Sequence, residues 1–106
     1  MKKRADGYCQ AFQKRLFRKI YPYINPRYRR EVSEDDYVDF IEFPGYTDSY
    51  FTVKTMTTAV LPTGRHGKVV IEITVYNYKK ELISQKIENQ DWILEKNEWY
   101  KVEKLQ

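Results

Sequence analysis

A carboxylate and two hydroxyl groups alternate along one predicted strand and form the best acid–base set in the sequence. In the stretch KVVIEITVYNY, Glu72 shares a face with Tyr76 and Tyr78, because side chains two residues apart in a strand point the same way. A carboxylate base in an apolar pocket, beside a hydroxyl that stabilises an oxyanion, would suit a proton-transfer enzyme of the isomerase or dehydratase type. Asp39, on a predicted helix, is a second candidate acid. We favour the simpler interpretation, in which Glu72 points to water from the polar face of its strand.

The single histidine and the single cysteine support neither a nucleophilic pair nor a metal site. His66 lies in the loop Thr63–Lys68, far from Cys9 in the sequence. The glycines and cations of this loop would suit an anion, but their spacing is not that of a phosphate-binding loop, so an exposed hairpin loop is preferred. Cys9 is interpreted as a small core residue. Because a closed zinc site needs four nitrogen or sulfur ligands, we expect no metal, and no motif calls for a cofactor.

The charge of the chain is divided unevenly along its length. Residues 1–30 hold ten basic residues against one acid, whereas residues 31–106 hold nine basic and fourteen acidic residues. One predicted basic surface consists of Lys14, Arg15, Arg18, Lys19, Arg29 and Arg30. Such a surface would suit nucleic acid or an anionic membrane surface. The favoured alternative is a solvated helix face that is paired in part with acids of the same chain or dimer.

The first half of the chain is predicted to be helical, and its helices position the basic residues named above. The pattern predicts a helix over residues 6–20 with Asp6 as N-cap, because Cys9, Phe12, Leu16 and Ile20 fall on one face at about 100° per residue. A short helical turn is predicted from Pro26, which suits a first helical position. Ser33 then opens a further helix, and this helix is predicted to bury Tyr37, Phe40 and Ile41 and to end at Pro44-Gly45.

The second half of the chain is predicted to be strands. Residues 50–60, 68–78 and 81–95 are rich in β-branched and aromatic residues and are separated by turn signals. A last hairpin turns at Lys96-Asn97. The 106 residues suffice for one domain, 1–106, with N-terminal helices packed on a strongly bent antiparallel sheet, in the α+β class.

The last hairpin is apolar on both faces. A two-residue turn at Lys96-Asn97 places Trp92, Leu94 and Trp99 on one face, and Ile93, Tyr100 and Val102 on the other. An antiparallel sheet with one wet face would not show this pattern. One face therefore covers the helices or a cavity, and the other predicts a second subunit, which makes a homodimer the expected partner.

The order of these segments resembles the nuclear transport factor 2-like, or cystatin-like, superfamily, and most of all its bacterial branch of unassigned function. The likeness rests on the amphipathic first helix, the stretch YPYINPRYRR, the helix start SEDDY, and strands that end in DWI and EWYKV. It implies a cone-shaped fold with a cavity, and dimerisation through the sheet. It also implies the cavity lining, which we assign to Trp92, Leu94, Trp99, Tyr37 and Phe12.

The leading hypothesis is a non-catalytic domain that binds a small apolar ligand or assembles through its sheet. The first alternative is a small isomerase or dehydratase, and the second is a nucleic-acid or membrane-binding module that uses residues 1–30. As it stands, the sequence predicts a cytoplasmic protein, whereas an upstream anchor or signal would make it extracytoplasmic.

Overall fold

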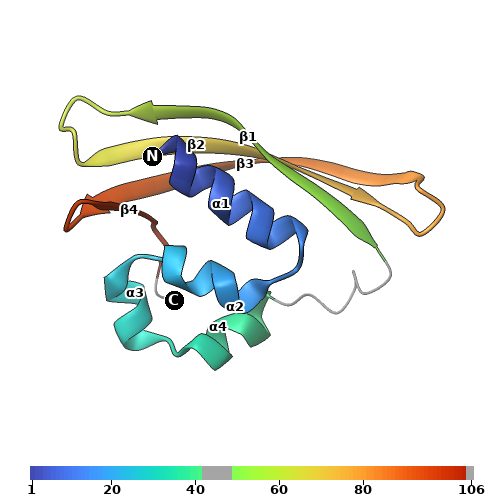
Figure 1. Ribbon diagram of the computed structural model, residues 1–106, viewed down its shortest axis with the longest axis horizontal. Helices are drawn as coiled ribbons and strands as arrows, with labels where there is room; N and C mark the ends of the chain where they lie inside the picture. Colours follow the sequence, from blue (N-terminus) through green and yellow to red (C-terminus); the bar gives the residue numbers. More distant parts are fainter. Residues whose placement is uncertain (42–48, 105–106) are drawn as a thin grey trace.

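The computed structural model describes residues 1–41 and 49–104, in which helices lie against one side of a four-stranded antiparallel sheet (Figure 1). The elements follow the chain in the order α1 (Lys2–Gln13), α2 (Phe17–Ile20), η1 (Tyr21–Tyr23), α3 (Pro26–Glu31), α4 (Glu34–Ile41), β1 (Tyr50–Val60), β2 (His66–Tyr76), β3 (Leu82–Glu95) and β4 (Glu98–Lys101). The predicted α+β class, with helices packed on a strongly bent antiparallel sheet, is confirmed.

The first helix begins earlier than predicted. Because α1 starts at Lys2, Asp6 lies inside the helix and is not an N-cap. The Asp6 carboxylate instead pairs with the Lys2 ammonium one turn away, at 2.9 Å. The predicted N-cap at Asp6 is wrong because the helix already includes the four residues before it, Lys2 to Ala5.

The first helix also ends earlier than predicted, so a single helix over residues 6–20 is wrong. Arg15 adopts a left-handed conformation with φ of 58°. The N–H of Leu16 then bonds to the carbonyl of Ala11, and the N–H of Arg15 to the carbonyl of Phe12, which is the Schellman arrangement that closes a helix. Glycine usually fills this position, so an arginine there gives no signal in the sequence. The break leaves Leu16 exposed instead of buried.

The two later helices follow their sequence signals more closely. Pro26 is the first residue of α3, and Ser33 precedes α4, where its Oγ accepts the N–H of Asp36 at 3.1 Å. Tyr37 is buried as predicted. Phe40, however, is 65% exposed, so its predicted burial is wrong. The predicted end at Pro44-Gly45 lies outside the described residues.

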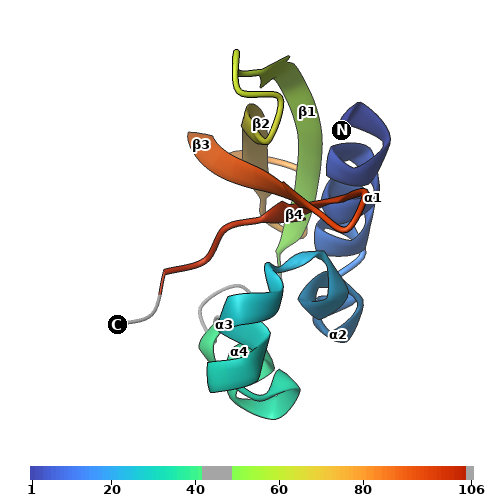
Figure 2. The same cartoon turned by 90° about the vertical axis from the view of Figure 1, so that its left-hand side faces the viewer.

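The sheet has the simple order β1-β2-β3-β4, and each strand pairs with its neighbour in the sequence. Along β2, Val69, Ile71 and Val75 are buried, as their alternation predicts, and Val69 and Ile71 belong to the core cluster that includes residues of α1. We call this face of the sheet the inner face and the opposite one the outer face. Figure 2 shows α1 against the inner face, and none of the helices in residues 1–41 and 49–104 lies on the outer one.

The terminal hairpin has the predicted register. Glu95 pairs with Glu98, Leu94 with Trp99 and Ile93 with Tyr100. Lys96 and Asn97 have φ of 49° and 66°, which is the pair of left-handed residues that a two-residue hairpin turn of type I′ requires.

An aromatic cluster joins α1 to the sheet. The ring of Tyr8 contacts Trp92 edge to face at 6.2 Å, and it contacts Tyr23 in the same way at 6.3 Å. The indole N–H of Trp92 donates to Gln90 Oε1 at 3.0 Å, so the largest buried side chain has its polar atom satisfied. This cluster fixes the position of α1 on the inner face.

Candidate functional site

The three candidate catalytic residues lie apart. Glu72 is on the outer face of β2, where its Oε1 lies 3.6 Å from Lys54 Nζ on β1. Tyr76 lies on the same face at the end of β2, opposite Tyr50, and Asp39 is exposed on α4. The lysine compensates the charge of Glu72, whose side chain is 18% exposed. This geometry is that of a cross-strand ion pair, and not that of a base in an apolar pocket beside a hydroxyl donor.

His66 and Cys9 also occupy separate places. His66 is exposed, with its Nδ1 3.3 Å from Thr63 Oγ1 in the same loop. Cys9 is buried, with its Sγ 3.6 Å from Thr55 Oγ1. Burial raises the pKa of the Cys9 thiol above its ordinary value, which disfavours the thiolate that nucleophilic chemistry needs. Within residues 1–41 and 49–104, no three His, Cys, Asp or Glu side chains gather as metal ligands would.

The predicted cavity residues come together as packing. Trp92 and Tyr37 are members of the core cluster, and Phe12 and Trp99 pack against it. Leu94 is half-buried next to Trp99 in the terminal hairpin. A lining role for these five residues around an apolar ligand stays a prediction.

Three of the four arginines of the predicted basic surface have partners in the fold. Arg18 binds Glu34 at 3.1 Å and Asp35 at 2.7 Å, and so joins α2 to α4. Arg29 donates to the carbonyl of Ile24 at 2.8 Å. The guanidinium of Arg15 donates to the carbonyl of Ser49 and lies 4.7 Å from the centroid of the Phe51 ring. The ion pairs of Arg18 agree with the favoured alternative, in which the basic helix face is paired in part with acids of the same chain.

The remaining members of that surface, Lys14, Lys19 and Arg30, are exposed. They lie on three different parts of the helical region, namely the end of α1, α2 and α3. Binding of nucleic acid or an anionic membrane surface through these cations stays a prediction.

The outer face of the sheet presents apolar side chains to solvent. The strand register aligns Tyr50, Tyr76 and Leu82 in one row across β1, β2 and β3. Tyr50 is 59% exposed and Leu82 is 61% exposed. Two rows further along, Ile87 stands beside Glu72 and is 49% exposed. Along the strand that carries Glu72 this face was predicted to be polar, and only the cross-strand register reveals how the apolar residues of neighbouring strands align on it.

Two cross-strand ion pairs lie on the outer face of the sheet. Lys54 lies beside Glu72, and Lys68 on β2 pairs with Asp91 on β3. The hydrogen bond from Lys68 holds the pKa of Asp91 below its ordinary value. The face therefore combines exposed apolar groups with two compensated charge pairs.

The second face of the terminal hairpin is covered in part by the chain itself. Ile93, Tyr100 and Val102 are half-buried. The guanidinium groups of Arg4 and Arg29 lie 5.3 Å and 5.4 Å from the centroid of the Tyr100 ring. At the other end of the sheet, by contrast, Tyr50 and Leu82 of the outer face are mostly exposed.

Sequence reasoning missed a buried polar group behind the helices. Tyr37 Oη is fully buried, and none of the described residues offers it a hydrogen-bond partner. Burial raises the pKa of Tyr37, and the nearby Glu103, Tyr28 and Glu88 raise it further. The pattern of α4 predicted the burial of this side chain, but a hydroxyl without a partner is visible only in three dimensions.

No protein-family model matches the chain, and a search of curated proteins finds no significant match. Among the described residues, no helix has the length and apolar character needed to cross a membrane. The structure defines an α+β protein with a curled four-stranded antiparallel sheet.

Proposed function

We propose that the protein is a non-catalytic assembly domain in which two copies join through the outer faces of their sheets. The exposure of Tyr50, Leu82 and Ile87, on a face that no helix of the described residues covers, carries this proposal. Burial of apolar surface contributes roughly 25 cal/mol per Å², so association of two such faces is favourable where the geometry allows close packing.

The charges on this face suit a second copy of the same chain. In a twofold arrangement the same patch lies on both partners, so a surface with uncompensated charge of one sign would repel itself. Lys54 with Glu72, and Lys68 with Asp91, give the patch equal numbers of each sign. The resemblance to nuclear transport factor 2-like proteins, which commonly dimerise through the sheet, agrees with this choice of partner.

The test places a charge on the outer face and a matched charge elsewhere. We expect Leu82→Lys and Ile87→Lys to give folded monomers in sedimentation equilibrium, whereas the wild-type chain sediments as a dimer. Phe40→Lys, which changes an equally exposed apolar residue on α4, should leave the dimer intact. A wild-type monomer at all concentrations, or a dimer that survives Leu82→Lys, contradicts the proposal.

A further inference from the structure

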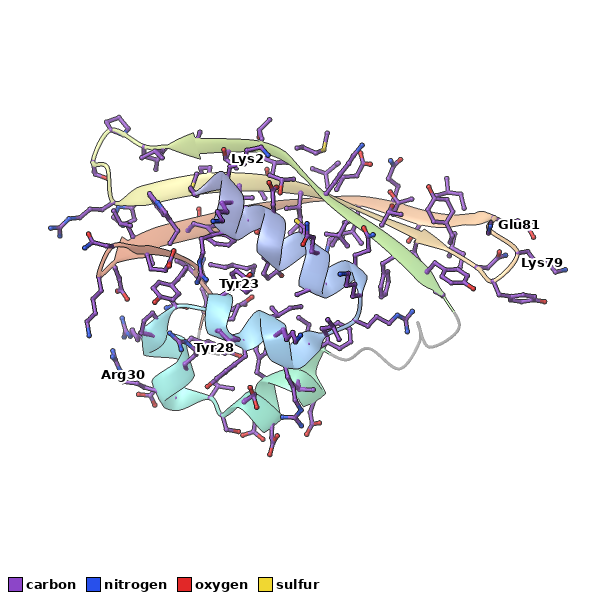
Figure 3. The ribbon with its side chains drawn as sticks, in the orientation of Figure 1. Lys2, Tyr23, Tyr28, Arg30, Lys79 and Glu81 are labelled. Atoms are coloured by element: carbon purple, nitrogen blue, oxygen red, sulfur yellow. The ribbon has the colours of Figure 1, made fainter. Side chains whose placement is uncertain are left out.

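The turn between β2 and β3, residues 77–81, is held in shape by hydrogen bonds. Asn77 Oδ1 accepts the N–H groups of Lys79 and Glu81 at 2.9 Å and 3.0 Å. The N–H of Asn77 donates to the carbonyl of Glu81 at 3.0 Å. Figure 3 shows Lys79 and Glu81 at the opposite end of the molecule from Tyr28 of α3. The turn therefore presents its exposed side chains away from α3.

Two apolar side chains are exposed at this turn. Tyr78 is 68% exposed and Ile83 is 53% exposed. Ile83 lies between the paired residues Leu82 and Ser84 as the extra residue of a β-bulge, which takes it out of the cross-strand pairing. Leu82 belongs to the outer face of the sheet. We call the following set the β2–β3 tip: Tyr78, Lys79, Lys80, Ile83 and Lys86.

The positive charge of the β2–β3 tip is uncompensated. None of its three lysines forms an ion pair with any described residue. Residues 77–86 hold these lysines and one acid, Glu81. The outer-face lysines Lys54 and Lys68, in contrast, are each paired with an acid. Because a twofold contact would bring like charges together, the tip does not suit a second copy of the chain and instead suits an anionic partner.

The combination of apolar and cationic side chains favours a lipid bilayer among anionic partners. Lys79 Nζ lies 5.8 Å from the centroid of the Tyr78 ring, so the two kinds of group are adjacent. A tyrosine ring suits the headgroup level of a bilayer, where lysines are attracted to anionic lipids. An aliphatic side chain such as Ile83 is stabilised at the boundary with the acyl chains, but it has no such partner in the phosphate backbone of a nucleic acid.

We propose that the β2–β3 tip docks onto the surface of an anionic lipid bilayer. Tyr78 and Ile83 enter the boundary between the headgroups and the acyl chains. The ammonium groups of Lys79, Lys80 and Lys86 contact the lipid phosphates and carboxylates. Apolar burial and electrostatic attraction add together in such binding, and each alone is weak. The tip contains none of the residues that carry the proposed dimer, so this inference does not rest on the proposed function.

Co-sedimentation with lipid vesicles at fixed ionic strength tests the tip. We expect the wild type to bind vesicles of phosphatidylserine and phosphatidylcholine in equal parts, and to bind pure phosphatidylcholine about tenfold more weakly or less. Lys79→Gln with Lys80→Gln should weaken binding to the anionic vesicles about tenfold or more. Tyr78→Ser with Ile83→Ser should also weaken it about tenfold, because the apolar anchor is lost.

The matched controls remove the same kinds of group from the helical region. Lys14→Gln with Lys19→Gln removes two exposed lysines, and Phe40→Ser removes an exposed ring from α4. Both controls should bind the anionic vesicles within about twofold of the wild type, because charges beyond a Debye length are screened. The tip variants keep Leu82 and Ile87, so their sedimentation without lipid should match that of the wild type. Loss of lipid binding is thereby measured separately from loss of the dimer.

Four results would overturn the inference. The first is a wild type that does not bind the anionic vesicles, and the second is equal binding to both kinds of vesicle. The third is a lysine control that weakens binding as much as the tip lysine variant does, which would assign the contact to the helical region. The last is binding to a single-stranded RNA oligonucleotide without binding to vesicles, which would assign the tip to nucleic acid.

Discussion

At the residue scale, Gly7 fits the helix to the core by having no side chain. A Cβ at this position would lie 2.3 Å from Tyr23 Oη and 3.1 Å from its Cζ. Tyr23 is held in place by the edge of Tyr8 and by the guanidinium of Arg4, 4.3 Å from its centroid, so the ring cannot move aside freely. Close packing of backbone against a ring is therefore the reason for a glycine inside α1.

Gly7→Ala should consequently destabilise the protein, although alanine is the better helix former. We expect an overpacking cost of about 1–3 kcal/mol, which exceeds the gain in helix propensity of about 1 kcal/mol. Urea unfolding measures the difference. The double variant with Tyr23→Phe removes the closest atom and should recover part of the loss; an equal loss in both variants would show that the hydroxyl is not the obstacle.

The buried tyrosines predict how stability depends on alkaline pH. Burial raises the pKa of Tyr8 and of Tyr37 above the ordinary value near 10, with neighbouring acids adding to the effect. The unfolded chain therefore ionises first, and the stability that these groups contribute is complete below about pH 10 and declines as pH rises above it. Urea midpoints measured across this range should fall for the wild type and fall less steeply for Tyr37→Phe. Parallel curves for the two proteins would contradict the assignment to Tyr37.

At the element scale, the turn between β3 and β4 depends on the backbone conformation of its own two residues. Lys96 and Asn97 both hold φ values that side chains with a Cβ adopt at a cost. Asn97→Gly should stabilise the protein by about 0.5–1 kcal/mol, because glycine reaches this conformation without strain. Asn97→Val should destabilise it by about 1–2 kcal/mol. Thermal unfolding measures both changes, and equal melting temperatures would show that the turn contributes nothing to stability.

Elements with a local cause were predictable from the sequence, and those with a distant cause were not. The turn at Lys96-Asn97 and the start of α4 at Ser33 each depend on a few adjacent residues. The break after α1 depends on Arg15, whose guanidinium reaches Ser49 and Phe51 across the chain. The features found at the candidate sites have a distant cause. The apolar row across the strands and the unpartnered hydroxyl of Tyr37 both arise from contacts between residues that are far apart in the sequence.

At the scale of the whole molecule, the uneven charge is used internally to hold the helices to the sheet and to one another. Arg4 on α1 binds Glu98 on β4 at 3.2 Å, and Arg18 on α2 binds acids of α4. Exposed ion pairs of this kind contribute about 0–1 kcal/mol each, so they orient the elements more than they stabilise them. What this arrangement leaves without cover is the outer face of the sheet.

Assembly through that face would link stability to protein concentration. A partner that binds only the folded chain raises the apparent stability by mass action, so the melting temperature of a dimer rises with protein concentration. We expect this rise for the wild type and for Phe40→Lys, and a constant melting temperature for Leu82→Lys, whose exposed leucine lies in the apolar row with Tyr50 and Tyr76. Differential scanning calorimetry over a hundredfold range of concentration provides the measurement. Because Leu82 is mostly exposed, its replacement should leave the monomer's own stability nearly unchanged, within about 0.5 kcal/mol. A concentration dependence that persists in Leu82→Lys would place the contact between copies on another surface of the molecule.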